Sequence, residues 1–123
     1  MNDNNPKPAP TADDLQAYLN ALTAMHDALY QAYPVATDEG QSAIFEISYK
    51  VSKMITALNQ AGIAADTAQL GALAPNIDAV NQQLQNAQKQ INTWINEVGI
   101  AKTVVGALDA AVNLGVSIYS KIP

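Results

Sequence analysis

The chain has 123 residues, with six lysines, eleven acidic side chains, no arginine and no cysteine, and its net charge at pH 7 is −5. Proteins usually bind nucleic acids and anionic lipid surfaces through clusters of lysine and arginine. This composition therefore argues against nucleic acid as a partner and makes a membrane surface a second choice. The absence of cysteine excludes disulfides, thiol catalysis and thiolate metal sites.

Apolar residues make up 49% of the chain and charged residues only 14%. That apolar content predicts a folded protein, and the length corresponds to one domain with one core. We expect a flexible polar tail over residues 1–11, followed by a single helical domain over residues 12–123. The first ten residues contain neither a basic segment nor an apolar one, so they do not resemble a secretory signal, and the cytoplasm is the default compartment.

Two helices are predicted in the first half of the chain. The first, residues 12–33, begins after Thr11, a good N-cap, and ends before Pro34, because proline disfavours helical geometry in the residue before it. The second, residues 38–61, begins after Thr37, another good N-cap. Apolar residues recur every three or four positions in both, which predicts one buried stripe on each helix. The stripes are Leu15, Tyr18, Leu22, Met25 and Leu29, then Ile44, Ile47, Val51, Met54, Leu58 and Ala61.

The second half of the chain allows two interpretations. An unbroken heptad spacing would permit one rod from Pro75 to Lys121, about 70 Å long at 1.5 Å per residue. In the interpretation that we favour, a third helix starts at residue 66 or 75 and ends at 98, where Gly99 closes it as a C-cap, and a fourth helix spans residues 100 or 103 to 121. Pro75 predicts a break or kink. Four helices of similar length would close into an antiparallel up-down four-helix bundle, which is the predicted all-α fold.

The C-terminal helix is apolar on every side. A helix in a four-helix bundle exposes one side, so a helix of this kind predicts cover from a second copy, another protein or a membrane. The plainer explanation is that small residues such as Gly106 and Ala107 bury little area. One apolar face contains Val105, Leu108, Val112 and Tyr119, and the other contains Ile100, Val104, Ala107, Ala111, Leu114 and Ile118.

These observations predict a non-enzymatic interaction module that associates through the C-terminal helix, as a homo-oligomer or by binding and neutralising a protein partner. The alternative is a membrane-active protein, pore-forming-like or associated with a lipid surface, that uses Gly99–Tyr119. A permanent span is not expected, because Asp109 near the centre of this stretch would cost about 3 kcal/mol. The residues expected at the contact are Val104, Val105, Leu108, Val112, Leu114, Val116, Ile118 and Tyr119.

No pattern for catalysis or metal binding is found. The only histidine, His26, lies at the edge of the first apolar stripe, where a packed side chain is far more common than a catalyst. If it were buried without a partner, it would respond to acid pH. Thr23 stands three residues before it, so the Glu-x-x-His motif of di-metal bundles is absent. We therefore expect no enzyme activity, no metal and no cofactor.

Two features of the third helix have plain interpretations. Trp94 falls on the heptad positions, which places it in the predicted core. An amide ridge also follows this helix, and a solvated face is the interpretation that we favour for it. The ridge contains Asn81, Gln85, Gln88, Asn92 and Asn96.

Overall fold

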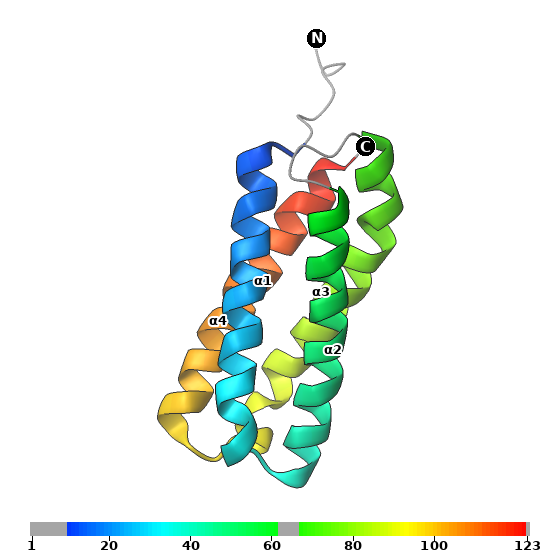
Figure 1. Ribbon diagram of the computed structural model, residues 1–123. Coiled ribbons are helices and arrows are strands. Elements are labelled where there is room, and N and C mark those ends of the chain that lie inside the picture. The colour runs from blue at the N-terminus through cyan, green and yellow to red at the C-terminus, as the bar shows by residue number, and fades with distance from the viewer. Residues whose placement is uncertain (1–9, 62–66, 123) are drawn as a thin grey trace.

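The computed structural model describes residues 10–61 and 67–122, which form four α-helices and one short 3-10 helix. Figure 1 shows the α-helices side by side along one axis, with successive helices running in opposite directions. Helix α1 contacts α2 and α4, and α3 contacts the same two helices, so the four close into a ring. The predicted antiparallel up-down four-helix bundle is confirmed. The elements are α1 (Ala12–Ala32), η1 (Tyr33–Val35, the 3-10 helix), α2 (Asp38–Ala61), α3 (Thr67–Trp94) and α4 (Val98–Lys121).

Three expectations fall on parts of the chain that the structure leaves out. The flexible tail expected at residues 1–11 lies almost entirely outside the described residues. Residue 66, one of the two starts expected for the third helix, and the side chain of Ala61 also lie outside them.

Helix α1 begins at a capping box built on Thr11, the predicted N-cap. The Thr11 hydroxyl accepts a 3.1 Å hydrogen bond from the backbone N–H of Asp14, and the Asp14 carboxylate accepts a 2.9 Å bond from the backbone N–H of Thr11. The same carboxylate accepts a 3.1 Å bond from Lys121 Nζ, which ties the start of α1 to the end of α4. The backbone N–H of Thr11 and then Lys121 lower the pKa of Asp14 below its ordinary value.

Helix α3 continues through Pro75, so of the predicted break or kink the break is wrong, and the kink stays a prediction. Proline removes one backbone hydrogen-bond donor from a helix and its ring crowds the preceding turn. Pro75 is exposed, however, and Ile77, two residues further on, is fully buried in the core. Packing of α3 against α2 and α4 therefore outweighs the local cost of the proline.

The chain turns between α3 and α4, which confirms the hairpin and rules out the continuous rod. The turn lies earlier than predicted, because α3 ends at Trp94 and α4 begins at Val98. Gly99 is therefore not a C-cap but lies in the first turn of α4. The N-cap is Glu97, whose carboxylate oxygens accept 3.0 Å hydrogen bonds from the backbone N–H groups of Gly99 and Ile100.

The loop between α1 and α2 holds this turn in place. The backbone N–H of Thr37 donates a 2.8 Å hydrogen bond to the carbonyl of Trp94 at the end of α3. Ala36 and Ile95 form an isolated antiparallel bridge next to it, and Ile95 is buried. The hydroxyl of Thr37 also caps α2, since it accepts a 3.0 Å bond from the N–H of Gly40. The two loops at this end of the bundle thus pair with each other.

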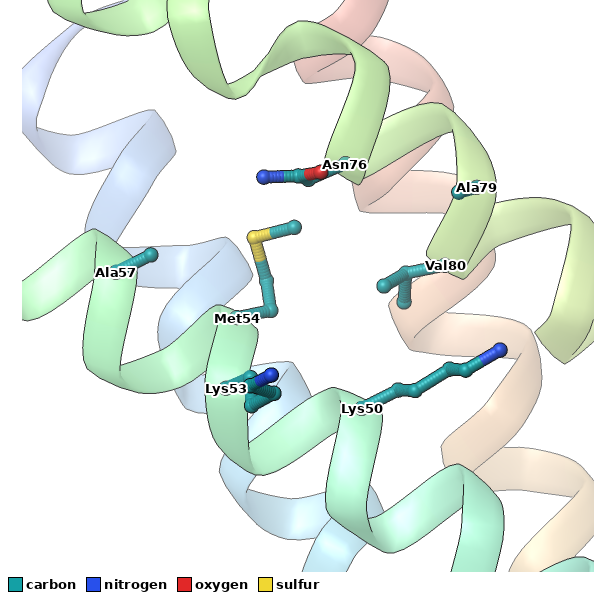
Figure 2. A pocket seen from close by; sticks show the side chains of 7 residues that line it. All are labelled: Lys50, Lys53, Met54, Ala57, Asn76, Ala79 and Val80. Carbon is teal, nitrogen blue, oxygen red and sulfur yellow. The ribbon is translucent and has the colours of Figure 1, made fainter.

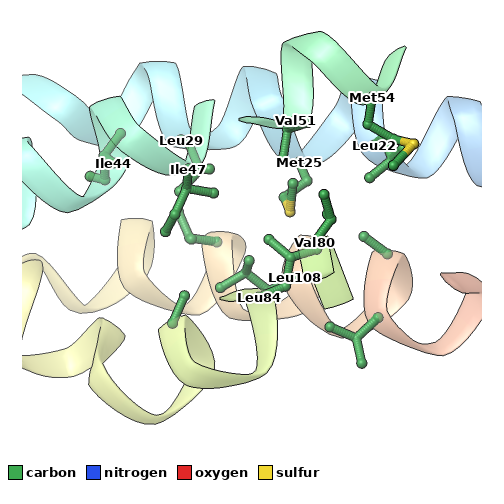
Figure 3. Packing of buried hydrophobic residues seen from close by; sticks show 14 of the residues in the cluster. Leu22, Met25, Leu29, Ile44, Ile47, Val51, Met54, Val80, Leu84 and Leu108 are labelled. Carbon is green, nitrogen blue, oxygen red and sulfur yellow. The ribbon is translucent and has the colours of Figure 1, made fainter. Parts of the chain in front are cut away.

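A single core of apolar side chains fills the centre of the bundle. Figure 3 shows Leu22, Met25 and Leu29 on α1 facing Leu84 and Leu108 from the opposite pair of helices. Trp94 is buried, as predicted. All the described side chains of the two predicted stripes are buried too, which confirms the periodicity argument. They are Leu15, Tyr18, Leu22, Met25, Leu29, Ile44, Ile47, Val51, Met54 and Leu58.

Candidate interaction surface

The bundle itself covers much of the apolar surface of α4. Val104, Leu108, Val112 and Ile118 are buried against the other helices, so these four expected contact residues are not accessible in the folded chain. Val105 and Leu114 are half-buried. Only Val116 and Tyr119, of the eight expected contact residues, are exposed.

The reason is that the buried side of α4 combines both predicted faces. Leu108 and Val112 come from the heptad face, whereas Val104 and Ile118 come from the second face. Small residues lie between them: Ala111 is fully covered and Gly115 is buried. Neighbouring helices can approach α4 closely at such small residues. Side chains from both predicted faces can therefore be buried on the same side of α4.

Of the helices that the structure describes, only α4 is long and apolar enough to cross a membrane, judged by length and composition alone. A core helix of a water-soluble bundle passes the same test. One third of the residues in the most apolar stretch of α4 are buried inside the bundle. The apolar character of α4 is thus partly accounted for by its place in the core.

The polar groups singled out in the sequence are dispersed. His26 is half-buried on α1, and its role as a pH sensor stays a prediction. Asn81 departs from the expected solvated ridge, since it is only 5% exposed and lies against Gly115 of α4. Gln88 is half-buried, and its amide donates a 3.5 Å bond to Asp109. Within residues 10–61 and 67–122, no group of three histidine, aspartate or glutamate side chains could hold a metal ion.

A different surface gathers exposed aromatic side chains. Phe45 and Tyr49 are 71% and 57% exposed on the outer side of α2, and Tyr33 of η1 is 40% exposed. All three line one open groove with a volume of about 620 Å³. We call this surface the aromatic groove. Its lining residues are Tyr33, Asp38, Gln41, Ser42, Phe45, Glu46 and Tyr49.

The register of α2 explains why these rings face outward. Ile44, Ile47 and Val51 are buried on the inner side of the helix. Phe45 and Tyr49 are four residues apart, so they lie one above the other on the same face, away from that buried side. The amide of Gln41 donates a 2.9 Å hydrogen bond to the carbonyl of Tyr33. That bond joins η1 to the first turns of α2.

Carboxylates accompany the rings in the aromatic groove. Asp38 and Glu46 line it, and its lining residues in the described part of the chain include no lysine. Lys50 Nζ lies 3.6 Å from Glu46, but both side chains are exposed, and an ion pair of this kind contributes little. Lys53 Nζ lies 5.0 Å from the centroid of the Tyr49 ring, in a cation–π contact. The groove therefore combines negative charge with ring faces that attract cations.

This surface is not among the predicted contacts, although the sequence contains a signal for it. Phe45 is the only phenylalanine of the chain, and it does not belong to the predicted stripe of the second helix. Tyr49 stands one helical turn later, also outside the stripe. A large aromatic residue off the buried stripe is exposed, and two at this spacing predict an aromatic face.

No protein-family model matches the sequence, and comparison with curated proteins and with solved structures found no match.

Proposed function

We propose that this chain is a non-enzymatic interaction module that binds another protein through the aromatic groove. The observation that supports the proposal is the exposure of Tyr33, Phe45 and Tyr49 in one groove. Exposed rings gain most when a partner buries them, and aromatic residues are frequent anchors at the centres of protein interfaces. The framework beneath the rings is a regular helix, so a partner would meet a preformed surface.

The groove favours a partner segment that carries apolar and cationic side chains together. Asp38 and Glu46 would pair with lysine or arginine of the partner, while Phe45 would contact its apolar residues. The net charge of −5 would draw such a segment towards the chain over distances near the Debye length. A second copy of this chain would bring the same two carboxylates and the same net charge, so a basic partner fits the groove better.

The predicted association through α4 now depends on few side chains. Val116 and Tyr119 are exposed on this helix, and Val98 is exposed at its start. Tyr33, Phe45 and Tyr49, in contrast, line one groove together. We therefore place the main contact on α2 and treat α4 as the competing surface.

Binding of a labelled amphipathic helical peptide of leucine and lysine, followed by fluorescence anisotropy, tests the proposal. Loss of an aromatic anchor at the centre of an interface costs about 2 kcal/mol, so Phe45→Ser should weaken binding roughly thirtyfold. Tyr30→Ser is the matched control, because Tyr30 is 76% exposed but lies outside the groove. Tyr119→Ser tests α4, and a loss confined to that variant would move the contact there.

The role of charge needs its own control. Glu46→Lys and Asp27→Lys change the net charge equally, but only Glu46 lines the groove. We expect Glu46→Lys to weaken binding of the peptide and Asp27→Lys to have a small effect. Equal losses would mean that a diffuse attraction between an acidic protein and a basic peptide explains the signal, and the groove would not be the site. Light scattering of the protein alone would reveal self-association.

The membrane-active alternative rests on the length and apolar character of α4. Insertion of Gly99–Tyr119 would require α4 to leave the bundle, which would expose Leu108 and its partners in the core. Dye leakage from anionic liposomes at acid and neutral pH, with Trp94 fluorescence recorded in parallel, tests this alternative. Intact liposomes and an unshifted Trp94 emission at both pH values would count against it.

A further inference from the structure

A second hollow lies between α2 and α3, separate from the aromatic groove. Its volume is about 440 Å³, within the usual range of small-molecule sites, which extends from roughly 300 to 1,000 Å³. Figure 2 shows the residues that line it, with Met54 rising from α2 and the amide of Asn76 pointing over it from α3. We call this hollow the lysine cleft. Its lining residues are Lys50, Lys53, Met54, Ala57, Asn76, Ala79 and Val80.

The floor of the lysine cleft is apolar. Met54 and Val80 are buried beneath it, and each belongs to the hydrophobic core. Ala57 of α2 and Ala79 of α3 line its walls, and such small side chains leave space between two helices. Methionine adapts its shape to irregular apolar contacts, so the floor suits a flexible alkyl chain.

The polar groups of the lysine cleft are cationic or neutral. Lys50 and Lys53 line it, and none of its lining residues within 10–61 and 67–122 is a carboxylate. These are two of only six lysines in a chain of net charge −5, so the cleft is a local concentration of positive charge. The long stems of lysine can lie on apolar surface while their ammonium groups stay in water. The amide of Asn76 adds a hydrogen-bond donor.

We propose that the lysine cleft binds a single-chain amphiphile with an anionic head group, such as a fatty acid. The alkyl chain lies on Met54 and Val80, and the head group lies between the ammonium groups of Lys50 and Lys53. Existing contacts do not block the arrangement. The Lys50–Glu46 pair is exposed and weak, and Lys53 lies in an exposed cation–π contact with the Tyr49 ring.

Other ligand classes match the lysine cleft less well. A small inorganic anion would leave the apolar floor formed by Met54 and Val80 uncovered. A cationic amphiphile would meet two like charges from Lys50 and Lys53. An amphiphile with an anionic head group would cover the apolar floor with its alkyl chain and pair its head group with the two lysines. Because the head group of a membrane lipid carries the same chemistry, the test must separate a free amphiphile from a lipid surface.

Isothermal titration of the full chain with decanoate, below its micelle-forming concentration, tests the proposal. We expect one bound decanoate per chain and no binding of decylammonium, which has the same chain length and the opposite charge. Replacement of both lysines (Lys50→Gln with Lys53→Gln) should weaken binding of decanoate at least tenfold. The matched control is Lys89→Gln with Lys102→Gln, which removes the same charge outside the cleft and should leave the affinity unchanged.

A second variant tests the cavity without changing its charge. Ala79 is exposed at the edge of the cleft, so Ala79→Phe should fill the hollow while the bundle stays folded. Binding of decanoate should be lost, and circular dichroism should show unchanged helix content. The proposal is overturned if decanoate binds Ala79→Phe or the double glutamine variant as tightly as the parent chain. Binding to phosphatidylglycerol vesicles but not to free decanoate would also overturn it.

This inference does not depend on the proposed function. Phe45 lines the aromatic groove but not the lysine cleft, so Phe45→Ser should leave decanoate binding intact. Conversely, Ala79→Phe should leave peptide binding intact. Failure of one proposal would therefore be distinguishable from failure of the other.

Discussion

Gly40 of α2 lies directly against Trp94 at the end of α3. A Cβ atom added at Gly40 would lie 2.7 Å from Trp94 Cβ and 2.8 Å from its carbonyl oxygen, closer than real contacts allow. The same carbonyl accepts the hydrogen bond from Thr37. This close approach joins the two loops at one end of the bundle, and it makes the glycine a structural requirement.

Gly40→Ala should therefore lower the free energy of unfolding by about 2 kcal/mol, because the obstructing atoms include the backbone of Trp94 and cannot move alone. Gly71→Ala is the control, since no atom lies within 4 Å of a Cβ at that position. Urea denaturation followed by circular dichroism measures both variants. Equal stability of the two would contradict the proposed close packing at Gly40.

A second tight contact joins Gly115 of α4 to Asn81 of α3. A Cβ at Gly115 would lie 2.7 Å from Asn81 Nδ2 and 2.8 Å from its Cγ, so Gly115→Ala should destabilise the bundle by about 1 kcal/mol or more. Gly106→Ala, on the same helix but in open space, should stabilise it by roughly 0.5–1 kcal/mol. Asn81→Ala combined with Gly115→Ala should lose less than the sum of the single changes in denaturation experiments. Strict additivity would mean that the two residues do not contact each other.

The contact of Asp14 with Thr11 and Lys121 predicts a dependence of stability on pH. Because the folded state lowers the pKa of Asp14, its contribution is present above the ordinary carboxyl pKa and is lost as pH falls through the lowered value. Asp14→Asn should thus be less stable than the parent chain at neutral pH, and the difference should shrink in acid. Thermal unfolding at several pH values measures this. Asp13→Asn is the control, because neither the capping box nor the contact with Lys121 involves Asp13.

The buried position of Leu108 predicts that a charged substitution there impairs folding and not only association. Leu108 is fully buried, so Leu108→Asp would place an unpaired charge in the core, at a cost of several kcal/mol, and should unfold the chain. Val116→Asp lies on the exposed side of the same helix and should leave the bundle folded. Circular dichroism and light scattering distinguish loss of structure from loss of self-association. A folded, merely dissociated Leu108→Asp variant would restore α4 as the contact surface.

Pro75 within α3 offers a route to a more stable protein. Pro75→Ala would supply the missing N–H donor and should raise the free energy of unfolding by up to about 3 kcal/mol. Pro34→Ala should bring no such gain, because Pro34 lies in the first turn of η1, where its fixed φ angle is suitable. The midpoints of urea unfolding compare the two. A loss of stability in Pro75→Ala would contradict the expected cost of a proline inside α3.

Sequence patterns alone determined the fold class and most of the core. The spacing of Leu22, Met25 and Leu29 and of Ile44, Ile47 and Val51 predicts two amphipathic helices, and all six side chains are buried. Thr11 and Thr37 predict the starts of these helices correctly. Such signals are local, since a cap or a stripe depends on residues within a few turns of one another.

The tertiary structure decided where the second half of the chain turns, which side of α4 is buried and which residues share a surface. The heptad spacing continues past residue 99, yet the chain reverses its direction after Trp94. At this turn the backbone N–H of Thr37 donates a hydrogen bond to the carbonyl of Trp94, and Ile95 is buried. Asn81 is buried because Gly115 of another helix leaves room for its amide. Tyr33 and Phe45 line the same groove because η1 lies beside α2, where Gln41 bonds the carbonyl of Tyr33. Each of these outcomes depends on contacts between segments that are distant in the sequence or joined by a turn, and the periodicity of a single helix carries no information about them.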